Sequence, residues 1–254
     1  MKQLIIIALT TLTGIMAQAQ VTETRTAQTV TALEVKNGIE VIYNQSNTNL
    51  LKVEADSRQT LDNVVTEVKG NTLKVYIKSS SAVNSHVAGI KVFVSQQNIT
   101  GFKIQNGSVL KAPGIMETAD LNIKLETGAT FLGNIHATGT CSIISKNGSG
   151  FRGTVNTEKF KGDVTAGGYI KISGSATTAE FFCSSASIQA GQFICKKADV
   201  MAKNASAVAI YTDTAIKIGT DASSNITYYG EPAKIDLGEN AYSIQRATQK
   251  LTLN

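Results

Sequence analysis

Hydrophobic and polar residues alternate along most of the chain, and a two-residue period of this kind predicts β-strands with one buried face. From residue 101 onward the alternation returns in short segments, which are separated by turns of small residues. The turn centres are Gly107, Gly128, Gly148, Gly167, Ala186, Ala205 and Ala222. Successive centres are 21, 20, 19, 19, 19 and 17 residues apart, which indicates a structural repeat of about 20 residues.

Equivalent positions of successive repeats carry similar residues. The fifth position before each centre is occupied by Phe102, Ile123, Ile143, Gly162, Phe181, Val200 and Lys217. A single repeat cannot bury its apolar face alone, whereas stacked repeats share one continuous core. The pattern therefore predicts an all-β fold, a parallel β-helix or β-solenoid of about six to seven coils at residues 101–240, with Phe181 in its core. An antiparallel meander with similar spacing is the alternative.

Residues 20–100 lack this repeat and predict ordinary strands, at residues 31–45, 50–56, 64–79 and 89–95. Asn37-Gly38 and Gly70-Asn71 are typical of turns between alternating segments, and residues 79–88 predict a polar loop. Because no flexible linker precedes the repeats, we expect an N-terminal β-strand region that caps the solenoid. Two independent domains are the alternative.

The alternation is interrupted near the end of the chain. Residues 228–232 read Tyr-Tyr-Gly-Glu-Pro and are expected to close the far end of the solenoid core. Residues 241–254 then follow as a C-terminal tail.

The first 19 residues have the three parts of an export signal. Lys2 gives a positive start, residues 4–16 are apolar, and Ala17-Gln18-Ala19 offers small residues for cleavage before Gln20. This apolar run is shorter than the roughly 20 residues that a membrane-spanning helix needs. We therefore expect residues 1–19 to be a signal peptide and the mature chain to have no transmembrane segment. The expected location is the periplasm, the outer surface or the extracellular space.

Composition narrows the class of protein further. Hydrophobic residues make up 42 % and charged residues 17 % of the 254-residue chain, which excludes a disordered acidic or basic protein. The formal net charge of +5 comes from dispersed basic residues, so no nucleic-acid partner is expected. Three cysteines are too few for a disulfide scaffold. Cys141, Cys183 and Cys195 lie in alternating segments and are expected to be buried thiols, with a Cys183–Cys195 disulfide as the alternative.

Candidate catalytic groups are sparse in the repeats. Glu180 and Asp199 are 19 residues apart, which places them on neighbouring coils as a possible carboxylate pair for glycoside hydrolysis. The simpler interpretation is a solvated face, because no further acid or arginine cluster surrounds them. His86 and His136 lack the pattern of a catalytic triad, and the glycine-rich turns lack the Gly-Lys-Ser/Thr ending of a phosphate loop. The sequence therefore predicts no catalytic residue, no cofactor and no metal site.

Several segments together resemble a known family. They are Lys36–Val41, Leu51–Asp56, Val64–Val68, Asn71–Val75 and Ile226–Pro232, and the likeness covers about residues 30–240. In this order, and with the small-residue corners, they resemble the bacterial envelope family named "Putative auto-transporter adhesin, head GIN domain". The resemblance implies an N-terminal strand region, a right-handed parallel β-helix and a role in adhesion, with no catalytic motif. Many corners in the family read Gly-Ser-Gly, whereas this chain has Ser-Ser-Ala-Ser, Lys-Asn-Ala-Ser and Thr-Asp-Ala-Ser.

The expected function is that of an exported, non-enzymatic cell-envelope or surface protein. It would act as an adhesin that binds a surface glycan or a protein ligand through its solenoid face. Two alternatives stay open: a carbohydrate-active β-helix enzyme that uses Glu180 and Asp199, and a structural or self-assembling envelope component.

Overall fold

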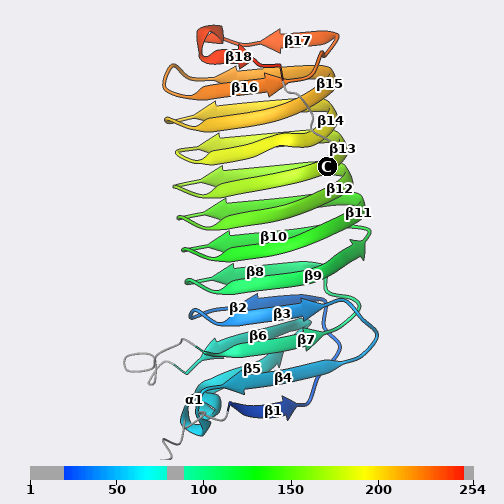
Figure 1. Ribbon diagram of the computed structural model, residues 1–254, viewed down its shortest axis with the longest axis vertical. Coiled ribbons are helices and arrows are strands. Elements are labelled where there is room, and N and C mark those ends of the chain that lie inside the picture. The colour runs from blue at the N-terminus through cyan, green and yellow to red at the C-terminus, as the bar shows by residue number, and fades with distance from the viewer. Residues whose placement is uncertain (1–19, 79–88, 249–254) are drawn as a thin grey trace, which may run out of the picture.

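The computed structural model describes residues 20–78 and 89–248, which form an elongated stack of β-strands (Figure 1). The expected signal peptide, the expected polar loop and His86 lie outside the described residues. The first part of the chain contains β1 (Val21–Arg25), β2 (Ala32–Val35), β3 (Glu40–Asn44), β4 (Leu50–Ala55), α1 (Arg58–Asn63), β5 (Val64–Lys69), β6 (Thr72–Ile77) and β7 (Lys91–Ser95). The rest contains β8 (Gly101–Gln105), β9 (Val109–Thr118), β10 (Leu121–Glu126), β11 (Thr130–Lys146), β12 (Gly150–Thr165), β13 (Tyr169–Ser184), β14 (Ser187–Lys203), β15 (Ala207–Thr220), β16 (Asn225–Tyr229), β17 (Lys234–Leu237), the 3₁₀ helix η2 (Ala241–Ser243) and β18 (Ile244–Arg246).

Parallel pairing joins the repeats. Each of the long strands β11 to β15 pairs in parallel with its neighbours on both sides, so equivalent residues of successive repeats lie in register. One inward column runs through Ile143, Gly162, Phe181, Val200 and Ile218. The predicted parallel β-solenoid is confirmed, and the antiparallel meander is wrong for these repeats.

The solenoid has about eight turns in the described part of the chain, rather than the predicted six to seven. One turn outside the predicted repeats consists of β2, a corner at Asn37-Gly38, and β3, and it stacks in parallel on β8 and β9. Asn37 and Gly38 have φ angles of 66° and 72°, in the same left-handed region as the corner residues Asn106 and Gly107. Asn37-Gly38 is therefore a solenoid corner, whereas Gly70-Asn71 joins the antiparallel strands β5 and β6 as a hairpin.

The strands of the N-terminal region are not stacked in chain order (Figure 1). The β2–β3 turn lies between β6–β7 and β8–β9 and pairs in parallel with both. β4 pairs antiparallel with β7 on one side and with β1 on the other. The N-terminal region thus contributes a solenoid turn as well as the antiparallel layer that covers one end of the stack.

Hydrogen bonds join the corners of successive turns. The two residues at most corners have positive φ, as for Asn147 at 54° and Gly148 at 72°. Such a pair turns the chain sharply, and glycine adopts this conformation without steric cost. The corner amide of Gly107 donates to the carbonyl of Thr127 at 2.9 Å, and that of Gly128 donates to Asn147 at 3.0 Å. The small residues at the predicted turn centres therefore serve the close stacking of one corner on the next.

The corner between β15 and β16 is built with a side chain instead. None of residues 221–223 has a positive φ. The Asp221 carboxylate accepts hydrogen bonds from the amide of Asn204 at 2.6 Å and from the amide and hydroxyl of Ser223 at 3.2 and 3.0 Å. These bonds favour the charged form and lower the pKa of Asp221 to about 2. A carboxylate thus replaces the left-handed backbone pair at the corner between β15 and β16.

Aromatic side chains and thiols fill much of the interior. One aromatic column contains Tyr43, Phe102, Phe131 and Phe151, and a second cluster contains Phe160, Phe181 and Phe193. Phe181 is only 3 % exposed, which confirms its predicted place in the core. The three cysteines are free and buried, as expected, and the alternative disulfide is not formed. Burial raises the pKa of Cys141 and of Cys195 to about 12.

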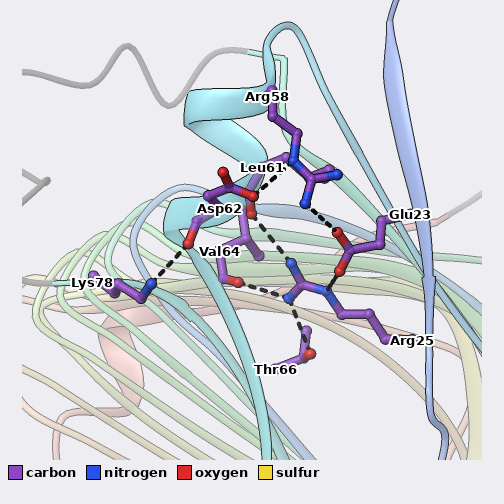
Figure 2. Close-up of polar contacts among 8 residues, drawn as sticks. All are labelled: Glu23, Arg25, Arg58, Leu61, Asp62, Val64, Thr66 and Lys78. Carbon is purple, nitrogen blue, oxygen red and sulfur yellow. Dashed lines mark hydrogen bonds and ion pairs between the residues drawn. The ribbon is translucent and has the colours of Figure 1, made fainter.

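Arg25 ties β1 to the helix and the strand that end the stack (Figure 2). Its guanidinium donates to the carbonyls of Leu61 at 3.2 Å and Val64 at 2.7 Å and to the hydroxyl of Thr66 at 3.1 Å. The Leu61 carbonyl belongs to the last turn of α1, where a cation is favourable, and it also accepts a hydrogen bond from the backbone N–H of Val64. The Glu23 carboxylate pairs with the same guanidinium at 2.8 Å. The half-buried Arg25 side chain therefore joins β1 to α1 and β5.

At the other end of the stack, the described residues leave part of the core exposed. Residues 228–232 do not close the core, contrary to expectation, because β17 continues the parallel ladder on β15 and β18 continues it on β16. Ile235 and Leu237 extend the inward columns of Ile216 and Ile218 but are 46 % and 39 % exposed. No further turn within the described residues covers these two side chains.

Candidate functional site

The solenoid presents two outer faces that meet at the corners. We call the surface of β8, β10, β17 and the second halves of β11 to β15 the pre-corner face. We call the surface of β9, β16, β18 and the first halves of β11 to β15 the post-corner face. Because side chains alternate along each strand, every second residue points outward and outward residues of successive turns form columns.

Glu180 and Asp199 lie on the pre-corner face. They are register partners on β13 and β14, so the prediction that neighbouring coils bring them together is confirmed. The Glu180 side chain is 64 % exposed and forms an ion pair with Lys161 at 3.2 Å. Their column continues through Lys217 to Asp236, with charges of both signs. This is the arrangement of a solvated face, and it lacks the apolar enclosure that a glycosidase gives its general acid.

The other residues considered for catalysis are not brought together. His136 is exposed, and its register neighbours are Glu117 and Asn156. Within residues 20–78 and 89–248 there is no group of three His, Cys, Asp or Glu side chains that could hold a metal ion. The glycine-rich segments at 147–150 and 166–168 are corners between strands.

A groove of about 510 Å³ crosses the post-corner face. It runs over the five stacked strands β12 to β16, and we call it the β12–β16 groove. Its lining consists of Arg152, Gly153, Thr154, Lys171, Ile172, Ser173, Gln189, Gly191, Gln192, Ala209 and Tyr229. Cations, amides, hydroxyls and one aromatic ring therefore share a single concave surface, with no carboxylate among them.

An irregularity in β14 shapes the groove. The register between β13 and β14 shifts after Lys171, and the register between β14 and β15 shifts after Ala190. Extra residues bulge out of β14 as a result, and one of them is Gly191. The Tyr229 ring packs against Gly191 so closely that an added Cβ would lie 3.0 Å from it. Bulges of this kind re-aim side chains and are common beside functional sites.

Arg152 and Lys171 give the groove its charge. They are direct register partners on β12 and β13, and both side chains are exposed. The Arg152 guanidinium lies over the Tyr169 ring, 5.3 Å from its centroid. Tyr169 in turn lies over Gly150, where any side chain would collide with the ring. Gly150 therefore leaves room for the Tyr169 ring, and the ring in turn positions the Arg152 guanidinium.

Arg152 and Lys171 are not among the site residues predicted from the sequence. Arg152 and Lys171 both lie four positions after their turn centres, Gly148 and Gly167, so the repeat alignment contains the signal. The β14 bulge that brings Gln192 and Tyr229 into the same groove leaves no such regular spacing.

The fold and the groove define a class of protein: an elongated parallel β-solenoid with an open polar groove on one face. The family model "Putative auto-transporter adhesin, head GIN domain" matches residues 30–232, and the chain belongs to this family. The resemblance drawn from the sequence is therefore confirmed. No match to the chain is found among curated proteins.

Solved structures share the fold over nearly the whole chain. A "putative adhesin" from Parabacteroides merdae is 14 % identical, with a TM-score of 0.79 and coverage of 91 % of this chain and 97 % of that chain. A "putative lipid binding protein" from Parabacteroides distasonis is 18 % identical, with a TM-score of 0.74 and coverage of 91 % and 98 %. A "putative adhesin" from the same species is 14 % identical, with a TM-score of 0.76 and the same coverages. In the described part of this chain, no helix is long and apolar enough to span a membrane.

Proposed function

We propose that this chain is an exported, non-enzymatic protein of the cell envelope or cell surface. It acts as an adhesin that binds a glycan or protein ligand through the post-corner face of its solenoid. The observation that carries the proposal is the β12–β16 groove, where hydrogen-bonding side chains and a tyrosine ring line one concave surface. The continuous strand ladder holds these side chains at fixed spacing, which lowers the entropic cost of binding.

The groove lacks the paired carboxylates that glycoside hydrolysis uses. Its lining contains no His, Cys, Asp or Glu side chain. The carboxylate pair Glu180–Asp199 lies on the other face, exposed and partly neutralised by Lys161. The family, whose name refers to adhesins, supports the same class of function.

Protease treatment of intact cells tests the surface location. The protein is followed with an antibody, a periplasmic protein serves as the intact control, and lysed cells show that the protease can cleave the folded solenoid. We expect the protein to be digested on intact cells while the control survives. Protection until the outer membrane is opened, together with cleavage in the lysate, would end the adhesin proposal and leave a periplasmic role.

A further inference from the structure

We propose that the β12–β16 groove binds an acidic glycan, with Arg152 and Lys171 as adjacent contacts for carboxylate or sulfate groups on the sugar chain. This inference rests on the proposed ligand-binding function and names the chemical class of the ligand.

The groove contains a pair of like charges, Arg152 and Lys171, with no carboxylate beside them. Arg152 and Lys171 are register partners, and adjacent strands are only about 4.8 Å apart, so the two cations destabilise the sheet when nothing binds them. Within the described residues, neither forms an ion pair with a carboxylate. Lys111, two turns away in the same column, is instead neutralised by Glu40 at 2.9 Å. An anion bound in the groove would supply the negative charge that Arg152 and Lys171 lack among the described residues.

The position of the Arg152 guanidinium suits an anion with two oxygens. The guanidinium lies over the Tyr169 ring, 5.3 Å from the ring centroid, and Tyr169 occupies the space above Gly150. Within the described residues the guanidinium makes no hydrogen bond, so its N–H groups are free to donate. These groups match the two oxygens of a carboxylate or sulfate in a bidentate contact. The site therefore has a positioned fork beside the more mobile Lys171 ammonium.

The polar groups around the two cations fit a sugar better than a peptide or a lipid headgroup. The side-chain amides of Gln189 and Gln192 both donate and accept, and so do the hydroxyls of Thr154 and Ser173, which lie 3.1 Å apart. Sugar hydroxyls need partners of both kinds. Tyr229 adds an apolar ring face with a polar tip. Five strands at about 4.8 Å spacing give the groove a length of roughly 19 Å, enough for an extended oligosaccharide.

Binding of defined polymers to the purified mature chain tests the inference. The probes are polygalacturonate, its methyl-esterified form in which the carboxylates are masked, heparin, and the neutral polymer dextran, measured by biolayer interferometry at about 0.15 M salt. We expect binding to polygalacturonate or heparin, much weaker binding to the esterified polymer and none to dextran. The double variant Arg152→Gln and Lys171→Gln should weaken the acidic-glycan binding by roughly tenfold or more, as expected for loss of charge-assisted hydrogen bonds.

A matched control separates recognition from general charge. Lys197→Gln with Lys217→Gln removes the same net charge from exposed positions of the pre-corner face. This variant should keep the wild-type affinity, and thermal melts should show that both double variants are folded. Equal losses in the two variants would overturn the inference, because binding would then follow net charge alone. Equal binding of polyglutamate, or of vesicles with anionic lipid, through the same two cations would also overturn it in favour of a peptide or membrane ligand.

Failure here can be distinguished from failure of the proposed function. If the acidic glycans do not bind but the protein is digested on intact cells, the ligand class is wrong and the surface adhesin stands. If they bind through Arg152 and Lys171 but the protein is protected within intact cells, the groove is correctly assigned and the surface role is wrong.

Discussion

Single residues decide how closely the turns of this solenoid approach one another. A Cβ at Gly153 would collide with the carbonyl oxygen of Gly133 in the preceding turn, so only glycine fits there. Phe181 and Phe182 are adjacent in the chain but differ in environment. The Phe181 ring points into the core, and the Phe182 ring points outward. Phe181 is 3 % exposed and lies 5.3 Å from the Phe160 ring, whereas Phe182 is 39 % exposed. The same residue type therefore contributes very differently at adjacent positions.

Phe181→Ala should lower the free energy of unfolding by about 3–5 kcal/mol, because it removes a buried ring and leaves a cavity in the aromatic cluster. Phe182→Ala is the matched control and should cost well under half as much, since its ring is already partly in water. Urea titrations of the wild-type chain and of both variants provide the measurement. Similar midpoints for the two variants would contradict the assignment of Phe181 to the core.

The corners and the end layer are the elements that organise the stack. Most corners rely on a left-handed backbone pair, and the corner between β15 and β16 relies on the Asp221 carboxylate. At the covered end, α1 and β5 are held to β1 by the Arg25 guanidinium, which reaches two backbone carbonyls and a hydroxyl. The elements at the covered end are thus held by the side chain of Arg25, whereas most internal turns are joined by backbone hydrogen bonds between corners.

Arg25→Ala should destabilise the protein by about 2–3 kcal/mol, because charge-assisted hydrogen bonds to the Leu61 and Val64 carbonyls are lost together. Arg58→Ala, on α1, is the control. Its side chain is 66 % exposed and its ion pairs with Glu23 and Asp62 face solvent, so the change should be within about 0.5 kcal/mol. Thermal and urea unfolding compare the two. A loss at Arg58 as large as that at Arg25 would show that general charge, and not the clamp, holds the layer.

Sequence reasoning succeeded at the element level where spacing is regular. Seven turn centres gave the parallel stack and the inward column of Phe181, because each residue in a coil has its equivalent about 20 positions away. The turn of β2 and β3 was not predicted, because β4 to β7 separate Gly38 from Gly107 and break the period. Lys36-Asn37-Gly38 does repeat the letters of Lys146-Asn147-Gly148, but a short motif without its spacing also fits a hairpin. The groove was missed for a related reason, since a bulge in β14 interrupts the columns there.

On the scale of the whole molecule, the two ends differ in protection. The antiparallel layer and α1 cover one end, while β17 and β18 form an outer turn whose Ile235 and Leu237 face water. A solenoid turn is stabilised by the neighbours on both of its sides, so a turn with one neighbour opens most easily.

Hydrogen exchange should therefore be graded along the stack. Backbone amides of β17 and β18 are expected to exchange fastest among the strands, and those of β11 to β13 slowest. Exchange followed by mass spectrometry of peptides resolves these segments. Uniform exchange of all strands, at the rate of global unfolding, would contradict this gradient and indicate one cooperative unit.

The interleaved position of β2 and β3 also constrains the order in which the chain can assemble. These strands are made early, yet the partners on both their edges, β6–β7 and β8–β9, come from later residues. A chain that emerges amino end first cannot complete its earliest turn until about residue 110 has followed. Winding must therefore wait for contacts that are distant in sequence, which slows folding.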